Sequence, residues 1–344
     1  MKLNAVSKNL HPRNVFRISR AARAEVRNVF VEVSAGEITG RGEASPNAYY
    51  DETAGNVRDL LEAAAPFVAG LEIETVADLE RAWLEAWPWL APSRAAQCAL
   101  DLALWEWLAR RRGVSVAELA LGRSPRPVQT FCTIGLSGES ELEIKAAEMR
   151  GFPLIKIKSD SMADLAPVAL IRRRTGATLA VDANGAWERV DFAAISRELA
   201  RMGVLFIEQP LSPARDERMP ELLAASELPI LADESCVTAE DVERMPGRFS
   251  GFNIKLVKCG GITPALAMAR QGRELGLRTM VGCMLESSLL IAAGTVVAQE
   301  TDFADLDGAW LLRDDPFTGL PLRKGVLTPG GGAGFGVEPR GGED

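Results

Sequence analysis

The sequence predicts an α/β protein in which a (β/α) barrel of the modified TIM type carries an N-terminal α+β capping domain. Three observations lead to this fold. The chain has 344 residues, which is too long for one small domain and suits a barrel with a modest partner domain. Beyond residue 125, short apolar runs alternate with amphipathic helical stretches. Before that residue, the chain shows a hairpin pattern followed by long helical patterns.

The capping domain is expected over residues 1–125. Apolar residues alternate along two segments on either side of Gly36, which predicts a β-hairpin. The hairpin segments are Val26–Val33 and Thr39–Glu43, and the helical patterns after them are Glu52–Val68, Val76–Trp87 and Ser93–Arg112. Ser93 is a favourable N-cap of the last helix and Gly113 a favourable C-cap. The sequence Ser124-Pro125-Arg126-Pro127 then breaks the helical pattern and marks the domain boundary.

The barrel is expected over residues 126–328, followed by a Gly-rich tail, 329–344, whose tip we expect to be mobile. Its apolar runs recur at the spacing of βα units, which favours a parallel barrel. The runs are Val128–Leu136, Pro153–Lys158, Thr178–Asp182, Val204–Glu208, Ile230–Asp233, Gly251–Leu256, Thr279–Met284 and Ala304–Leu306. The helical stretches between them are Glu139–Arg150, Asp164–Thr175, Asp191–Arg201, Ala239–Met245 and Thr263–Leu275. A doubly wound sheet is the alternative, but the first run lacks the Gly-rich phosphate turn that such a sheet places there.

Composition excludes several kinds of partner. The net charge of −8 disfavours nucleic acids and anionic membranes, which need clustered cationic surface. Residues 1–10 hold no apolar run, and the longest one, Leu289–Ala298, is far short of the roughly 20 residues that span a bilayer. The five cysteines stand singly, which is typical of free thiols in a reducing compartment. We therefore expect a cytoplasmic protein without a signal peptide that binds a small molecule, and a homo-oligomer is compatible with these features.

The use of basic residues is unusual. Only 8 of the 39 basic residues are lysines, so the chain uses arginine where it needs only positive charge. Four of these lysines nevertheless lie in two short apolar segments, at Lys156, Lys158, Lys255 and Lys258. A buried lysine shifts its pKa readily, whereas arginine stays charged in a protein. Lysines in these positions therefore indicate proton transfer.

Polar residues stand at the C-terminal ends of the middle strands. In strand order they are Lys156 and Lys158, Asp182 and Asn184, Glu208, Asp233 and Glu234, and Lys255. From Lys158 to Lys255, the five main positions are 24, 26, 25 and 22 residues apart, which is one βα unit each time. Because these strand ends meet at one mouth of a barrel, we expect the residues to converge.

Three carboxylates on adjacent strands would repel one another unless a cation lay between them. They are Asp182, Glu208 and Asp233. Ligation by oxygen alone favours Mg²⁺ over zinc. Lys158 and Lys255 flank the carboxylates, so a substrate carboxylate on the metal would present its α-carbon to two lysines on opposite faces. One lysine would remove the α-proton and the other would deliver a proton from behind, with the metal and Lys156 stabilising the enediolate.

Each motif alone also has an ordinary structural interpretation. Lys-Ile-Lys fits a half-exposed strand, and Asp-Ala-Asn-Gly and Asp-Glu-Ser are common helix N-caps. A glutamate before Gln-Pro can simply end a strand. The order of the whole set and its spacing of one βα unit favour the functional interpretation over chance.

Five segments resemble the muconate-cycloisomerase-type branch of the enolase superfamily: K-I-K-S-D, V-D-A-N-G-A-W, F-I-E-Q-P-L, L-A-D-E-S-C and F-N-I-K-L-V-K-C-G-G-I. The resemblance covers nearly the whole chain, including the capping domain. It implies Mg²⁺ on the three carboxylates and an acid–base pair of Lys158 and Lys255, in keeping with the lysine bases and Mg²⁺-stabilised enediolates of this superfamily. It also implies a structural ion pair, not catalysis, for Lys258.

The end of the eighth strand, F-A-D-L-D-G, resembles the marker of the dipeptide epimerases within this branch. The resemblance implies that Asp305 and Asp307 bind the α-ammonium of the substrate's N-terminal residue. It also implies that Cys283, in G-C-M-L-E-S-S, lines the substrate, with Thr133 and Lys156 beside it. The activity that it suggests is epimerisation of murein-derived L-Ala-D/L-Glu dipeptides. The structural alternative is a turn with two exposed aspartates.

Specificity for the second residue of the dipeptide is expected from the capping domain. Its loops Ser19–Arg23 and Tyr49–Asp51 face the barrel mouth in this family. Arg20 and Arg23 are candidates to bind a glutamate side chain, although surface positions are equally consistent with a chain so rich in arginine.

Two other functions stay open at this point. A lyase or cycloisomerase of the same superfamily, such as o-succinylbenzoate synthase or muconate cycloisomerase, would use the same metal and lysines but no ammonium site. A barrel that binds a ligand without chemistry would not need the full set of lysines and carboxylates. The single histidine, His11, lies outside the expected barrel, which excludes a His–Asp racemase and a Ser-His-Asp hydrolase.

Overall fold

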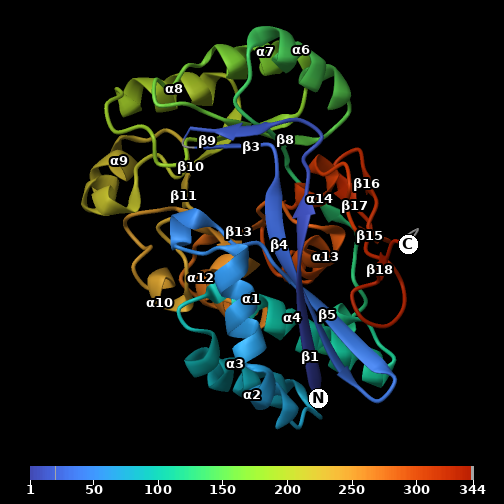
Figure 1. Ribbon diagram of the computed structural model, residues 1–344. Coiled ribbons are helices and arrows are strands. Elements are labelled where there is room, and N and C mark those ends of the chain that lie inside the picture. The colour runs from blue at the N-terminus through green and yellow to red at the C-terminus, as the bar shows by residue number, and fades with distance from the viewer. Residues whose placement is uncertain (20, 342–344) are drawn as a thin grey trace.

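The computed structural model describes residues 1–19 and 21–341. Figure 1 shows the strands and helices of the barrel, coloured green to red, and those of the N-terminal region, coloured blue to teal, packed against them. A sheet of eight strands forms the barrel, and a separate antiparallel sheet lies in the N-terminal region. The predicted α/β barrel with a strand-rich N-terminal domain is therefore confirmed.

The capping domain is built on a three-stranded antiparallel sheet in the order β1-β4-β5. Its strands are β1 (Lys2–Leu10), β4 (Val26–Ala35) and β5 (Ile38–Ala44). β4 and β5 form the predicted hairpin, and Gly36 has a φ of +61° in its turn, a conformation that favours glycine. The sequence pattern does not predict β1, because only Ala5 and Leu10 of that strand are buried and polar residues hide the alternation.

The helices of the capping domain follow this sheet. They are α1 (Ala54–Ala63), α2 (Ala65–Ala69), α3 (Val76–Leu90), α4 (Arg94–Arg112) and α5 (Val116–Leu121). The helix predicted from Glu52 to Val68 is thus divided into α1 and α2. The Ser93 hydroxyl accepts a hydrogen bond from the backbone amide of Ala96, and Gly113 ends α4 with a φ of +67°. Both predicted caps of α4 are therefore confirmed.

Helix α4 lies between the capping sheet and the barrel. All its residues from Ala95 to Ala109 are buried because β5 contacts one side and barrel helices contact the other. Gly42 of β5 permits this close approach, since a Cβ atom there would lie 1.9 Å from the carbonyl oxygen of Ala99.

The barrel strands are parallel and neighbours in sequence are neighbours in space. They are β7 (Cys132–Ile134), β8 (Leu154–Lys158), β9 (Thr178–Asp182), β10 (Val204–Glu208), β11 (Ile230–Ala232), β12 (Gly251–Lys255), β13 (Arg278–Gly282) and β14 (Phe303–Asp305). The backbone amide of Phe131 donates to the carbonyl of Ala304 at 2.8 Å, which brings the first strand against the last. The first and last strands of the barrel are therefore adjacent.

The first predicted run is divided in the structure. Its beginning, β6 (Val128–Gln129), leaves the barrel and pairs in a small antiparallel sheet with β17 (Val326–Leu327), which also pairs with β16 (Leu322–Arg323). Only β7 continues into the barrel.

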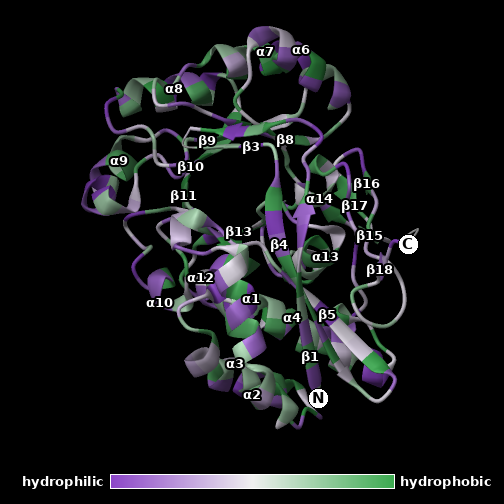
Figure 2. Cartoon of the chain, in the orientation of Figure 1, coloured by the Kyte–Doolittle hydropathy of each residue, from purple (hydrophilic) through white to green (hydrophobic). Residues whose placement is uncertain are grey.

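Helices follow the barrel strands. They are α6 (Glu139–Glu148), α7 (Ala166–Arg174), α8 (Phe192–Arg201), α9 (Met219–Ala225), α10 (Ala239–Val242), α11 (Leu256–Cys259), α12 (Ile262–Glu274), α13 (Ser288–Val297) and α14 (Gly308–Leu311). Figure 2 shows hydrophilic and hydrophobic residues mixed along the outer helices α7 and α8, as the amphipathic patterns predict. The sequence pattern does not predict α13, because every residue of this helix is buried and no polar face marks its period.

Alternation along the strands separates an apolar floor from a polar mouth in the barrel interior. The floor is a cluster formed by Phe131, Ala180, Phe206, Leu231 and Met280. Its aromatic rings pack edge to face, with 5.5 Å between the ring centroids of Phe131 and Phe206. Two residues further along these strands, on the same face, stand polar side chains. These are Thr133, Asp182, Glu208 and Asp233.

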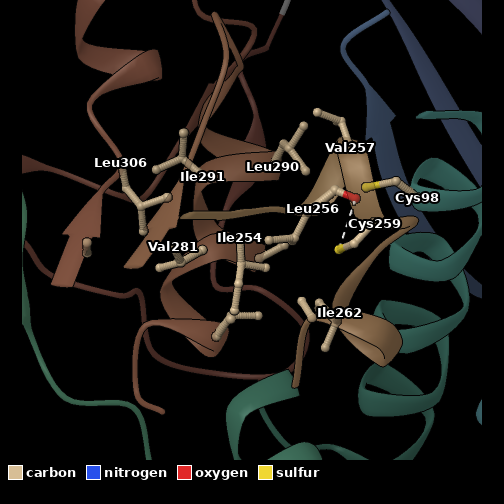
Figure 3. Packing of buried hydrophobic residues seen from close by; sticks show 14 of the residues in the cluster. Cys98, Ile254, Leu256, Val257, Cys259, Ile262, Val281, Leu290, Ile291 and Leu306 are labelled. Carbon is tan, nitrogen blue, oxygen red and sulfur yellow. Dashed lines mark hydrogen bonds between the residues drawn. The ribbon is translucent and has the colours of Figure 1, made fainter. Parts of the chain in front are cut away.

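An apolar interface joins the capping domain to the barrel. Figure 3 shows Cys98 of α4 beside Leu256 and Cys259 of α11, within the large core shared by both domains. Polar contacts fix the orientation at its edge: the Thr263 hydroxyl donates to Asp101 at 2.6 Å. Within residues 1–19 and 21–341, no helix has both the length and the apolar character needed to cross a membrane.

The Gly-rich tail packs against the rest of the protein. β18 (Glu338–Pro339) pairs with β15 (Phe317–Thr318), and the backbone amide of Val116 donates to the carbonyl of Gly334 at 2.9 Å. Val337 is buried. The tip of the tail, 342–344, which the sequence predicts to be mobile, lies outside the described residues.

Candidate active site

A cavity of about 540 Å³ lies between the barrel mouth and the capping domain. The barrel side includes the predicted site residues Thr133, Lys156, Lys158, Asp233, Lys255, Cys283, Asp305 and Asp307. The capping side includes the hairpin of β2 (Phe16–Ile18) and β3 (Ala21–Arg23), and a 3₁₀ turn at Ala48–Tyr50. Residues at the ends of seven barrel strands and from two capping segments therefore meet at one place, as expected of a barrel mouth.

Three buried carboxylates lie together beside this cavity: Asp233 lines it, and Asp182 and Glu208 lie behind the lining residues Lys158 and Lys156. Asp182 ends β9, Glu208 ends β10, and Asp233 directly follows β11. One oxygen from each lies within 4.8 Å of the others, and the three residues are at most 1% exposed. A close, buried, oxygen-only set of this kind fits Mg²⁺, whose preferred ligands are carboxylate and water oxygens.

Each carboxylate of this set accepts a hydrogen bond from a lysine. The ammonium of Lys158 lies 2.5 Å from Asp182 Oδ2, and that of Lys255 lies 2.7 Å from Asp233 Oδ2. Lys156 donates to Glu208 Oε2 at 2.9 Å. The lysines neutralise charge that burial makes costly.

The lysines and burial act in opposite directions on the pKa values of the carboxylates. Burial and the neighbouring Asp182 raise the pKa of Glu208 to about 7. Burial also opposes ionisation of Asp233, but Lys255 and Lys258 outweigh it and lower the pKa of Asp233 well below its ordinary value. In return, Asp233 raises the pKa of Lys255 above its ordinary value, although burial acts to lower it.

Lys258 is fully enclosed and makes structural contacts. Its ammonium donates to Asp233 Oδ1 at 2.7 Å and to the backbone carbonyls of Asp233, Cys236 and Asn253 at 2.5, 3.0 and 3.2 Å. Since Lys258 does not line the cavity, it orients a carboxylate instead of meeting a substrate.

Two supporting residues were missed by sequence reasoning. The side-chain amide of Asn253 donates to Glu208 Oε1 at 2.7 Å, and the Gln209 side-chain oxygen accepts from the backbone amide of Asp233 at 2.7 Å. The sequence position of each could have indicated its role. Asn253 stands two residues before Lys255 on the same strand face, and Gln209 directly follows Glu208. Asn253 therefore orients the Glu208 carboxylate from the side that Lys156 does not reach, and Gln209 fixes the backbone that carries Asp233.

The end of β14 contributes a second pair of buried carboxylates. The backbone amide of Thr133 donates to Asp307 Oδ2 at 2.6 Å, and the Thr133 hydroxyl donates to Asp305 Oδ1 at 3.2 Å. Burial and Asp305 raise the pKa of Asp307 to about 7. Such a pair at a cavity wall is a good receptor for a cationic group, which relieves the repulsion between the two carboxylates.

Asp305 also forms an ion pair with Lys156, which in turn contacts Glu208. Sequence distance hides this contact, because β14 is the strand farthest along the chain from the three carboxylates. Closure of the barrel nevertheless brings β14 against β7, whose other neighbour β8 carries Lys156. Asp305 therefore belongs to the same charge network as the three carboxylates.

The remaining predicted residues lie around the rim. Arg23 is exposed on β3 and lines the cavity, and half-buried Cys283 lines it from the loop after β13. Arg20 lies outside the described residues. The backbone amide of Leu136 donates to the carbonyl of Arg17 at 2.9 Å, which attaches the β2–β3 hairpin to the barrel.

Fold and site together define a capped (β/α) barrel with an acidic ligand set and lysines at its mouth. The family model described as mandelate racemase / muconate lactonizing enzyme, N-terminal domain, matches residues 2–122. The model described as enolase C-terminal domain-like matches residues 141–343. The chain therefore belongs to the enolase superfamily, in the mandelate racemase / muconate lactonizing enzyme group, which confirms the predicted family.

Characterised relatives in this superfamily are isomerases that act on amino-acid derivatives. The chain is 37% identical over 328 residues to an L-Ala-D/L-amino acid epimerase of Flavobacterium johnsoniae, covering 95% of this chain and 96% of that one. It is also 37% identical to the L-Ala-D/L-Glu epimerase of Escherichia coli K12, covering 91% and 94%. A dipeptide epimerase from Methylococcus capsulatus, solved with Mg and the dipeptide L-Arg-D-Lys, superposes with a TM-score of 0.88 at 29% identity, covering 98% and 99%.

The structural role of Lys258 leads to a stability prediction. Replacing Lys258 with Met leaves three buried carbonyls without this donor and removes one of the two cations on Asp233. We expect a loss of about 3–5 kcal/mol in the free energy of unfolding, measured by urea denaturation. Lys2→Met, the same change at an exposed position of β1, should stay within about 0.5 kcal/mol. A loss below about 1 kcal/mol for Lys258→Met would contradict the structural role.

Proposed function

We propose that this protein is a Mg²⁺-dependent dipeptide epimerase of the L-Ala-D/L-Glu type that inverts an α-carbon by two-base proton transfer through an enediolate. One observation carries the proposal: Lys158 of β8 and Lys255 of β12 reach one cavity from separate strands, and the three carboxylates stand on the strands between them. The names of the relatives support the dipeptide class.

Asp182, Glu208 and Asp233 are the residues that would hold the metal. A bound Mg²⁺ supplies Lewis-acid polarisation of the substrate carboxylate and draws the charge of the three carboxylates away from the lysines. Asn253 orients the Glu208 carboxylate, and Gln209 holds the backbone of Asp233, each through a hydrogen bond.

The two lysines move the proton. One lysine, neutral at its Nζ atom, takes the α-proton from one face of the substrate. The resulting enediolate has negative charge beside the buried Lys156 ammonium, which stabilises it. The other lysine, starting as an ammonium, delivers a proton to the opposite face. The two lysines exchange protonation states in one turnover, so each direction of the epimerisation uses one as base and the other as acid.

Asp305 and Asp307 would bind the substrate ammonium. A cation placed between them favours their ionised forms, so it lowers the raised pKa of Asp307 as it binds. Thr133 holds both carboxylates in place through its amide and hydroxyl. At the other end of the cavity, Arg23 is placed to attract an acidic side chain on the second residue of the dipeptide.

The metal site is tested by chelation and by one ligand substitution. Chelation with EDTA should abolish epimerisation, and added Mg²⁺ should restore it. Glu208→Gln should weaken Mg²⁺ binding in calorimetry by about tenfold or more, since one charged ligand is lost while Asp305 still neutralises Lys156. Glu221→Gln, on the exposed face of α9, should bind Mg²⁺ as the wild type does. Full turnover after exhaustive chelation would refute the metal site.

The two bases are tested separately. Lys158→Ala and Lys255→Ala should each lose net epimerisation by about 10²–10⁴-fold, because each lysine serves one face. Each variant should still exchange the α-proton of one epimer with D₂O, followed by NMR, and the two variants should retain opposite epimers. Equal residual exchange of both epimers in both variants would contradict two bases on opposite faces.

The ammonium site is tested with a modified substrate. N-acetylation of L-Ala-L-Glu removes the cation that Asp305 and Asp307 would bind, which should lower kcat/KM by the equivalent of about 2–5 kcal/mol. Asp307→Asn is the preferred variant, because Asp305 also contacts Lys156. It should impair turnover of the free dipeptide while Mg²⁺ binding persists. Equal rates for the free and acetylated dipeptides would refute the ammonium site. Turnover of an o-succinylbenzoate precursor, without turnover of either dipeptide, would favour the lyase alternative.

A further inference from the structure

The single histidine of the chain lies at a junction between the two domains. His11 follows β1, and its backbone carbonyl accepts from the amide of Arg313 at 3.0 Å. Its Nδ1 atom lies 2.5 Å from Asp314 Oδ2 in the barrel domain, and its Nε2 atom lies 3.1 Å from Glu25 Oε2 in the capping domain. One imidazole thus contacts two carboxylates from separate domains.

Glu25 connects this junction to the substrate cavity. It stands two residues after β3, at the base of the hairpin that covers the cavity, and it lines the cavity together with Arg23 and Arg27. The end of the cavity that faces the capping domain therefore contains two guanidinium groups and one carboxylate, and His11 contacts that carboxylate from behind.

We propose that His11 is a specificity-determining positioning residue, which acts through Glu25 to favour substrates with an acidic second residue. As an imidazolium, it holds and neutralises Glu25, so that Arg23 and Arg27 determine the charge seen by the substrate. As a neutral ring, it releases Glu25 toward those arginines, and the preference for an acidic side chain falls. This inference rests on the proposed dipeptide substrate.

The chemistry of imidazole supports this assignment. A neutral ring has one donor and one acceptor, so it cannot donate to two carboxylates at once, whereas the imidazolium can. Asp314 makes a second hydrogen bond to His11, because its Oδ1 atom accepts from the backbone amide of His11 at 2.7 Å. Glu25 shows no such second contact with His11, so its contact is the one that deprotonation breaks.

The charged groups around the imidazole of His11 determine the pH at which it loses its proton. The hydrogen bond to Asp314 raises the pKa of His11, with a smaller contribution from Glu25, whereas partial desolvation and the positive charge of Arg313 act to lower it. A raised pKa means that the imidazolium is present below that pKa and is lost as the pH rises through it. The preference for acidic dipeptides is therefore greatest at the lower pH.

The test compares two isosteric substrates. The ratio of kcat/KM for L-Ala-L-Glu to that for L-Ala-L-Gln cancels the titration of the catalytic lysines, because both substrates use the same chemistry. Across about pH 6–9, the range in which a histidine titrates, this ratio should fall by about two- to fivefold in the wild type, the range that a half-exposed ion pair supports.

Two variants separate the effect of His11 on Glu25 from other effects of pH on the ratio. His11→Gln should give a ratio that is low and independent of pH, because Glu25 is never neutralised. Glu25→Gln, which leaves the His11–Asp314 contact intact, should give a ratio that is high and independent of pH. A flat ratio in the wild type, or a pH-dependent ratio in Glu25→Gln, overturns the inference. If the wild type epimerises neither dipeptide at any pH, the proposed function itself fails, which is a distinguishable result.

Discussion

Burial of three carboxylates at the mouth of the barrel is the constraint on which the site depends. Three acidic groups this deep in a protein need compensating cations, and the chain supplies them from the strands on either side. Lys156 and Lys158 come from β8, Lys255 comes from β12, and Lys258 contributes from α11. Lys158 and Lys255, which we propose to move the proton, are thus among the cations that make the acidic cluster compatible with a folded barrel.

The capping domain holds the other side of the cavity through its own buried polar contacts. The Asn28 side chain donates to Glu43 at 2.7 Å and to the carbonyl of Leu285 at 3.0 Å, and Glu43 accepts from the amide of Ser287 at 3.1 Å. The loop after β13, which carries Cys283, is therefore shaped by the N-terminal sheet. Residues of the capping domain and of the barrel therefore shape this side of the cavity together.

Much of the barrel site could be predicted from sequence because it follows local periodicity. Asp182, Glu208 and Asp233 each come at the end of a short, continuous apolar run, and their spacing of one βα unit indicates that they converge. The contact between Asp305 and Lys156 could not be predicted in this way, since it depends on closure of the barrel. The contacts of His11 could not be predicted either, because packing between the two domains brings its partners Glu25 and Asp314 together.

The enclosure of α4 has a consequence for biosynthesis. This helix is apolar on the side that faces the capping sheet and also on the side that faces the barrel, and the second side is covered by α11 and α12, which are translated much later. At about 5–20 residues per second, the segment that begins at Leu256 emerges roughly 7–30 s after α4. During that interval the nascent chain exposes an apolar helix face, and transiently exposed surface of this kind favours aggregation until the barrel covers it.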